Sequence, residues 1–348
     1  MFRPIVFTAV SLSLLGIVTP AAAQTTFSWT NSGGGSYHTL GNWTPNGGPP
    51  IFDDHALFNL SSTYGVTFAN NGTSTLDFDV RNGNVTFSYI NASATHNWNP
   101  SATSSVGPQS GDAQVAATLN LINMFNNPMR GGDLIVGQAA GKSGTLNINT
   151  NGRWLGFDNA NVTVGQIGNG NLNITTSGIL QNSSLGGYNI EIGKQGGTGN
   201  ALVSGLNASM TASNVLSVGG GANSTGSLTI SAGGIVNVAD SLFMGVVSAK
   251  NNSLSVEGAG SMLNLGNDLT QIGLAGGKGT LSVTSGGKVV NHSSGIYLGK
   301  DAGSSGNLIV SGAASQFISS DIGAMTIGDG GVGSVVVSSV GNVTVDRI

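Results

Sequence analysis

The sequence predicts an all-β protein: a parallel right-handed β-helix with three short strands in each coil of roughly 27 residues and an aromatic N-terminal cap. Three observations support this. The chain is rich in residues that favour turns and strands, a glycine-marked phrase recurs at a steady period, and apolar residues alternate with polar ones within each phrase. Of 348 residues, 57 are Gly, 39% are apolar and only 7% are charged. Few helix-forming residues remain, so nearly all of the structure is expected to be β.

Composition also limits the class of protein. The 57 Gly and 8 Pro residues make up a smaller share than in low-complexity disordered chains, so this chain is expected to fold. The net charge is −4 and no basic run occurs, which argues against binding to nucleic acid. There is no cysteine, which excludes disulfides, thiolate zinc sites and cysteine nucleophiles.

Residues 1–23 have the pattern of a signal peptide. Arg3 supplies a positive charge, residues 5–18 are apolar, and small residues ending at Ala23 precede Gln24. The apolar stretch is about 14 residues long, whereas a membrane-spanning helix needs roughly 20. We therefore expect a bacterial protein that is secreted or displayed at the cell surface, associated with the outer membrane, and that has no transmembrane helix after signal removal.

Residues 134–348 contain eight repeats. Each repeat opens with an apolar-x-apolar-Gly phrase, and the closing glycines lie 26 to 29 residues apart. These structural glycines are Gly137, Gly165, Gly193, Gly219, Gly245, Gly273, Gly299 and Gly328.

Two further phrases follow in each repeat. A second alternating phrase, such as Leu146-Asn147-Ile148, comes seven to nine residues after the glycine, and a third, such as residues 235–238, follows a Gly-rich turn. Alternation places one face of each strand inside and the other in solvent. Strands this short find enough partners only by stacking coil on coil. A β-propeller is the main alternative, but its blades need four strands in about 40 or more residues.

Residues 24–133 lack this period and are expected to form an N-terminal cap followed by irregular early coils. They hold three of the four tryptophans, Trp29, Trp43 and Trp98. An aromatic cap built around Trp29 and Trp43 would cover the first coil, which otherwise exposes an apolar column and a strand edge. Alternation at 66–68, 76–78 and 85–87 predicts strands.

The cap and repeat phrases resemble those of a known family. The cap reads Trp29 … Gly41-Asn42-Trp43-Thr44-Pro45 … Asp53-Asp54-His55-Ala56-Leu57-Phe58, and the three repeat phrases recur in order over 134–348. This pattern is similar to the type V secretion/PEP-CTERM-associated repeats of bacterial surface proteins and autotransporter passengers. The resemblance implies an exported, passenger-like β-helix that serves as a structural protein or adhesin.

The sequence departs from that family at its C-terminal end. Neither a translocator barrel nor a Pro-Glu-Pro sorting tail follows the eighth coil, which ends at Ile348. We therefore expect a fragment truncated at the C-terminus, with an unusual secreted product as the alternative. An outer-membrane translocator barrel is expected only if the chain is a fragment.

Candidate catalytic and metal-binding residues are sparse. A β-helical enzyme should carry acids at the same phase of adjacent coils, but the acids of the repeats fall at scattered phases: Glu191, Asp240, Glu257, Asp268, Asp301, Asp321 and Asp329. A second group, His38 with Asp53, Asp54 and His55, has the chemistry to ligate a metal, and Asp77 with Asp79 that to hold calcium. We interpret the group around His38 as polar cap residues, and Asp77 and Asp79 as carboxylates on a solvated face. No catalytic, metal or cofactor site is predicted.

The most regular outward feature flanks the second phrase. The pairs are polar and uncharged and should stack into a flat ladder: Thr145/Asn147, Asn171/Asn173, Ser227/Thr229, Ser253/Ser255 and Thr280/Ser282. Hydrogen bonding along the axis is the structural interpretation, and binding of glycans or ice is the functional one. The sequence thus predicts an exported noncatalytic structural or adhesive surface protein with host or environmental glycans or other surface proteins as partners. The alternative is a β-helical lyase or hydrolase that acts on polysaccharides.

Overall fold

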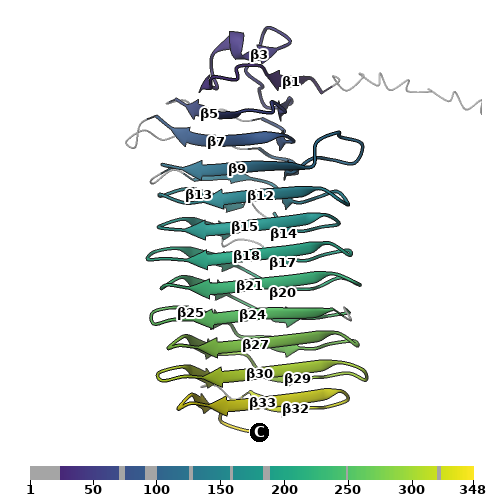
Figure 1. The fold of residues 1–348 in the computed structure, drawn as a ribbon, viewed down its shortest axis with the longest axis vertical. Helices are drawn as coiled ribbons and strands as arrows, with labels where there is room; N and C mark the ends of the chain where they lie inside the picture. Colours follow the sequence, from purple (N-terminus) through teal and green to yellow (C-terminus); the bar gives the residue numbers. More distant parts are fainter. Residues whose placement is uncertain are drawn as a thin grey trace, which may run out of the picture.

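The computed structural model of the chain describes residues 24–69, 75–90, 100–124, 128–156, 160–182, 189–247, 250–319 and 323–348. Within them the chain winds into a parallel β-helix whose coils stack from the N-terminal to the C-terminal end (Figure 1). The predicted fold is confirmed: three sheets run along the rod, and each regular coil contributes one strand to each. The predicted signal peptide, Trp98 and Asp321 lie outside the described residues.

The first phrase of each repeat forms sheet 1, in which thirteen strands are described. All neighbours pair in parallel except β1 and β3, which are antiparallel. From β11 onward each strand ends immediately before a repeat glycine. Its strands are β1 (Thr26–Trp29), β3 (Trp43–Thr44), β4 (His55–Phe58), β6 (Asp77–Val80), β8 (Ser104–Val106), β11 (Leu134–Val136), β14 (Val162–Val164), β17 (Ile190–Ile192), β20 (Leu216–Val218), β23 (Leu242–Met244), β26 (Leu269–Ile272), β29 (Gly295–Leu298) and β32 (Ala324–Ile327).

The second phrase forms sheet 2, which has twelve described strands and the longest ones. At a spacing of about 4.8 Å between strands, this sheet makes a rod about 50 Å long. Its strands are β2 (Gly35–Ser36), β5 (Thr63–Phe68), β7 (Gly83–Tyr89), β9 (Ala116–Ile122), β12 (Ser143–Ile148), β15 (Asn169–Thr175), β18 (Thr198–Ser204), β21 (Thr225–Ser231), β24 (Asn251–Glu257), β27 (Lys278–Thr284), β30 (Ser305–Ser311) and β33 (Val332–Ser338).

The third phrase forms sheet 3, with nine strands in the described part of the chain. It begins later than the other two sheets because the first coils contribute no described strand to it. Its strands are β10 (Met129–Gly131), β13 (Arg153–Gly156), β16 (Ile179–Asn182), β19 (Ser209–Ala212), β22 (Ile235–Val238), β25 (Met262–Leu265), β28 (Lys288–Asn291), β31 (Gln316–Ser319) and β34 (Asn342–Thr344).

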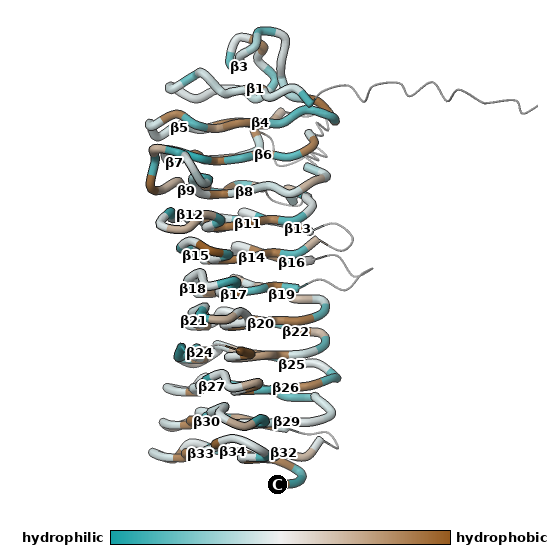
Figure 2. The backbone as a smooth tube through the Cα atoms, turned by 90° about the vertical axis from the view of Figure 1, so that its right-hand side faces the viewer, coloured by the Kyte–Doolittle hydropathy of each residue, from teal (hydrophilic) through white to brown (hydrophobic). Residues whose placement is uncertain are grey.

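The core is a continuous apolar column along the axis. Apolar and polar stretches alternate along the coils (Figure 2), and the apolar positions of all three sheets point inward. Leu146 and Ile148 of β12, for example, are fully buried and stack on Leu172 and Ile174 of β15. Alternation with a period of two therefore builds the core as predicted, because each new coil places its apolar residues on those of the coil before.

The N-terminal end of the column is closed by aromatic residues. Trp29 and Trp43 are 2% and 0% exposed, and their rings meet edge to face with centroids 5.1 Å apart. Tyr37 meets Trp43 edge to face and stacks on Phe68, and the short 3-10 helix η1 (Leu40–Asn42) leads into β3. The strands predicted at 66–68, 76–78 and 85–87 correspond to β5, β6 and β7, which pair into the same sheets as the later coils.

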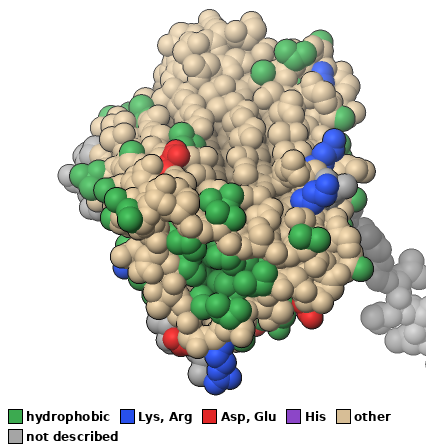
Figure 3. All heavy atoms as spheres, turned by 60° about the horizontal axis from the view of Figure 1, so that its bottom comes forward, with side chains coloured by type: hydrophobic (Ala, Val, Ile, Leu, Met, Phe, Trp, Pro, Cys, Tyr) green, Lys and Arg blue, Asp and Glu red, His purple; other side chains and the backbone are tan. Residues whose placement is uncertain are grey.

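At the opposite end, β32, β33 and β34 are the last strands of the three sheets, and apolar side chains reach the surface there (Figure 3). Val332 is 66% exposed and Val340 is 80% exposed. Charged side chains lie around this apolar patch (Figure 3). The one described helical element is a single short turn, so none of the described residues forms a helix long and apolar enough to cross a membrane.

Candidate functional site

The outer face of sheet 2 carries the predicted polar ladder as two parallel columns. In the first column, the Asn147 amide donates to Asn120 Oδ1 and the Asn173 amide donates to Asn147 Oδ1, both at 2.8 Å. In the coil after Asn173 the column is broken by Leu202, and it resumes with Thr229 in the following coil. These bonds run along the axis, so the side chains link successive coils outside the backbone ladder.

The second column continues further along the rod. The Asn200 amide donates to Asn171 Oδ1 at 3.2 Å, Ser253 donates to Ser227 Oγ at 3.2 Å, and Ser334 donates to Asn307 Oδ1 at 2.7 Å. The structure thus stacks the predicted pairs and links many of them by hydrogen bonds, as expected for axial bonding between coils. The two columns form a long face made mainly of amides and hydroxyls, and the charged residues Glu257 and Lys278 lie beside them at strand ends.

The eight repeat glycines occupy equivalent corners between sheets 1 and 2. All have positive φ, from +60° at Gly245 to +78° at Gly137 and Gly193. At all of them except Gly328 a side chain would also collide with the next coil: a Cβ on Gly165 would lie 2.1 Å from Thr198 O. Glycine is required here for both backbone conformation and close approach. These residues therefore form the turns of the rod.

The structure does not bring His38, Asp53, Asp54 and His55 together as a metal centre. The Asp54 carboxylate accepts the Ile51 backbone N–H at 3.0 Å, while the His55 ring pairs with Asp77 of the next coil. Across the described residues, no three metal-ligating side chains are grouped to hold an ion.

The expectation that Asp77 and Asp79 share a solvated face is wrong for Asp79, which is 5% exposed. Its carboxylate accepts hydrogen bonds from Arg81 at 2.7 Å, Ser105 at 2.5 Å and Gln109 at 2.7 Å. The turn after β8 places Gln109 over this carboxylate, which sequence alternation could not predict. Arg81 supplies the opposite charge, and the carboxylate is satisfied by the protein itself.

The other acids have structural partners or lie in solvent. Glu191 pairs with Lys194 three residues later, the Asp268 carboxylate accepts from Ser241 at 2.9 Å, and the Asp301 carboxylate accepts the Ala275 N–H at 2.9 Å. Glu257 and Asp329 are exposed, and Asp240 is half-buried. The described acids of the repeats thus lie at scattered positions of the coils, as expected from the sequence.

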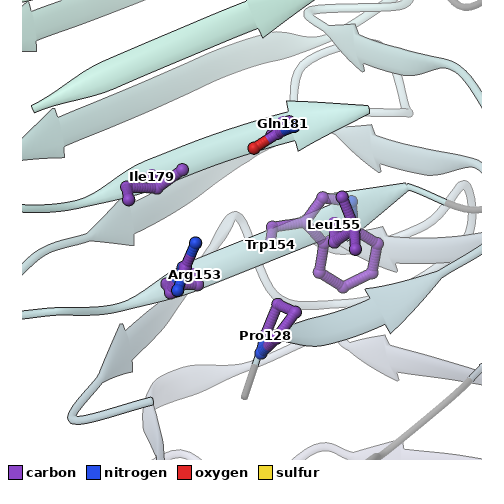
Figure 4. A pocket seen from close by; sticks show the side chains of 6 residues that line it. All are labelled: Pro128, Arg153, Trp154, Leu155, Ile179 and Gln181. Atoms are coloured by element: carbon purple, nitrogen blue, oxygen red, sulfur yellow. The ribbon is translucent and has the colours of Figure 1, made fainter. Parts of the chain in front are cut away.

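A small hollow of about 100 Å³ lies on the outer face of sheet 3 (Figure 4). It is lined by Pro128, Arg153, Trp154, Leu155, Ile179 and Gln181. The Trp154 ring is part of the core, with its centroid 6.3 Å from that of Phe78. The hollow is shallow and lies between two adjacent strands, β13 and β16.

Two features of the rod were not predicted from the sequence. Asn252 takes the place that glycine holds in the neighbouring coils at the start of β24, and its buried amide accepts from Gly226 N at 2.8 Å and donates to Lys278 O at 3.0 Å. On the outer face of sheet 1, Phe243, Gln271 and Tyr297 lie in register on three successive strands. The sequence did carry a signal for this row on sheet 1, because aromatic residues stand at the second position of the first phrase in two of these repeats.

Comparisons with protein families, curated proteins and solved structures find no match to this chain.

Proposed function

We propose that this chain is an exported, noncatalytic structural or adhesive surface protein, the passenger-like β-helix of a secreted or autotransported bacterial protein. The observation that carries the proposal is the outer face of sheet 2. Its columns of stacked amides and hydroxyls form a rigid, repetitive polar surface along the rod. Such a face offers many equivalent polar contacts, which suits adhesion to an extended surface.

The arrangement of the carboxylates supports a noncatalytic role. General acid–base chemistry on a glycosidic bond needs a pair of acids that face one substrate. Here the buried carboxylate of Asp79 is bound by Arg81 and Ser105, and Glu191 is paired with Lys194. Carboxylates engaged in this way stabilise the coils and are poorly placed to exchange protons with a ligand.

The pattern of residues 1–23 supports export. Expression of the full chain in a Gram-negative bacterium, followed by cell fractionation and N-terminal sequencing, tests this part. We expect a product outside the cytoplasm that begins at Gln24. A cytoplasmic product that retains Met1 to Ala23 would contradict the proposal.

Adhesion is tested with two matched single variants. Asn173→Ala removes the 2.8 Å axial amide bond to Asn147 from sheet 2, whereas Asn264→Ala removes the equivalent 2.8 Å bond to Asn237 from the outer face of sheet 3. We expect adhesion to host or abiotic surfaces to fall only with the sheet 2 variant, both variants keeping the β circular-dichroism spectrum. Release of products from a polysaccharide panel by the wild-type chain would favour the β-helical enzyme instead.

A further inference from the structure

The outer face of sheet 1 holds a compact set of side chains that differs from the ladder of sheet 2. Ser217, Phe243, Gln271 and Tyr297 occupy the same outward position on β20, β23, β26 and β29, in direct register. Lys300 follows β29 at the corner. We call these five residues the aromatic track.

Gln271 lies at the centre of the track and is only 3% exposed. Its strand neighbours Thr270 and Ile272 point into the core, so its side chain points outward between the side chains of Phe243 and Tyr297. Within the described residues its amide makes no hydrogen bond. Solvent still reaches the amide oxygen and nitrogen. The amide end is therefore a nearly buried donor and acceptor that is free to bind a ligand.

The rings on either side of Gln271 are half-buried. The Tyr297 ring leans along the strand over Gly295: one ring carbon would lie 3.2 Å, and the hydroxyl 3.7 Å, from a Cβ at that glycine. Phe243 and Tyr297 are two strands apart, about 10 Å, which is about the length of two linked hexose rings. Aromatic faces at this separation can pack against every second ring of a chain that lies along the axis.

Lys300 adds a positive charge to this surface. Its ammonium lies 4.9 Å from the centroid of the Tyr297 ring. No carboxylate of the described residues pairs with it, in contrast to Lys194, which occupies the same corner four coils earlier and is bound by Glu191. Lys300 is therefore a cation available to an anionic ligand.

We propose that the aromatic track binds an acidic polysaccharide, a chain of uronate-type sugars that lies along the rod. Its sugar rings pack on Phe243 and Tyr297. One sugar hydroxyl bonds to the Gln271 amide, and one sugar carboxylate pairs with Lys300. A saccharide fits better than a peptide because the backbone groups of sheet 1 are already used between coils, so an extended peptide cannot add to this face as a strand. This inference rests on the proposed adhesive function and names its ligand class.

Binding of the full chain to three polymers tests the ligand class: polygalacturonate, its methyl-esterified neutral form, and polyglutamate. We expect polygalacturonate to bind most tightly in calorimetry, the neutral form about tenfold more weakly, and polyglutamate not measurably. Equal binding of polyglutamate would show that charge alone is recognised and would overturn the saccharide assignment. Absence of polygalacturonate binding would overturn the inference outright.

Single variants test the site. Tyr297→Ala and Gln271→Ala are each expected to weaken binding of polygalacturonate about tenfold, whereas Ile135→Ala, at the same outward position on β11, should not change it. Lys300→Met should remove the preference for the acidic polymer, and Lys288→Met on sheet 3 should not. Binding that survives the track variants, with circular dichroism unchanged, would refute this site.

The failures of the two proposals are distinguishable. A chain found at the cell surface that does not bind polygalacturonate refutes the track alone. A chain that binds polygalacturonate through the track but stays in the cytoplasm refutes the exported function alone.

Discussion

Replacing Gly199 by Ala tests whether the coils are held together by close backbone approach. Gly199 begins the inward side of β18 and pairs with Gly170 and Gly226 in the coils on either side. A Cβ at this position would lie 2.2 Å from Val164 O and 2.3 Å from Gly193 N. These two atoms are the partners of a 2.8 Å hydrogen bond between coils, so the methyl group would be forced against that bond.

The expected cost follows from this geometry. Real contacts to a Cβ are longer than 3.0 Å, so the coils must separate locally by about 1 Å. Overpacking of this kind costs about 1–3 kcal/mol, and loss of the hydrogen bond about 1 kcal/mol more. We therefore expect Gly199→Ala to lower the free energy of unfolding by about 3 kcal/mol, through steric contact alone, since φ here is not positive.

Urea denaturation of the full chain, followed by far-ultraviolet circular dichroism, measures the change. Gly65→Ala in β5 is the matched control, because no heavy atom lies within 4 Å of its added Cβ and its φ is also not positive. It should change the free energy of unfolding by no more than about 0.5 kcal/mol. If Gly199→Ala unfolds at the wild-type urea concentration, or if Gly65→Ala costs as much, close approach does not govern coil stacking.

Three further predictions concern other parts of the rod. Asn252→Ala should lower the free energy of unfolding by about 2–3 kcal/mol, because it leaves Gly226 N–H and Lys278 C=O buried without their partner; a loss below about 1 kcal/mol in urea denaturation would contradict this. Burial raises the pKa of the Tyr64 hydroxyl, so folding favours the neutral phenol. The contribution of Tyr64 to stability should therefore be constant below about pH 10, the ordinary tyrosine pKa, and fall above it. In thermal melts from pH 8 to 11.5, Tyr64→Phe should lose less stability than wild type, and equal losses would refute this assignment. The exposed apolar residues of the last coil should promote self-association of the chain. Val336→Lys, at a site that is 47% exposed, should then reduce the association measured by light scattering; unchanged association would show that this coil is not the contact.

Much of the fold could be predicted from local sequence pattern. The first phrase of each repeat became a strand of sheet 1 that ends at its glycine, and the inward Leu, Ile and Val positions became the core. Both results depend on local backbone geometry. Side chains alternate between the two faces of a strand, and a turn such as that at Gly165 requires a positive φ.

The candidate sites were less predictable, because they depend on residues a coil or more apart. Asp79 alternates as an outward residue yet is buried, since Gln109 and Ser105 from the next coil cover its carboxylate. His55 lies beside Asp54 in sequence but pairs with Asp77, which is 22 residues away. Neighbours along the rod decide such contacts, and strand periodicity carries no information about them.

The sequence by itself determined the strands, the glycine corners, the inward column and the outward character of the polar phrases, because these follow from backbone preferences and hydrophobic burial within one coil. Tertiary structure decided which outward side chains meet. The turns absorb the variation in coil length, so that Phe243, Gln271 and Tyr297 come into register although 28 residues separate the first two and 26 the last two. Parallel pairing between coils sets that register, and only the assembled rod places a free amide between two rings.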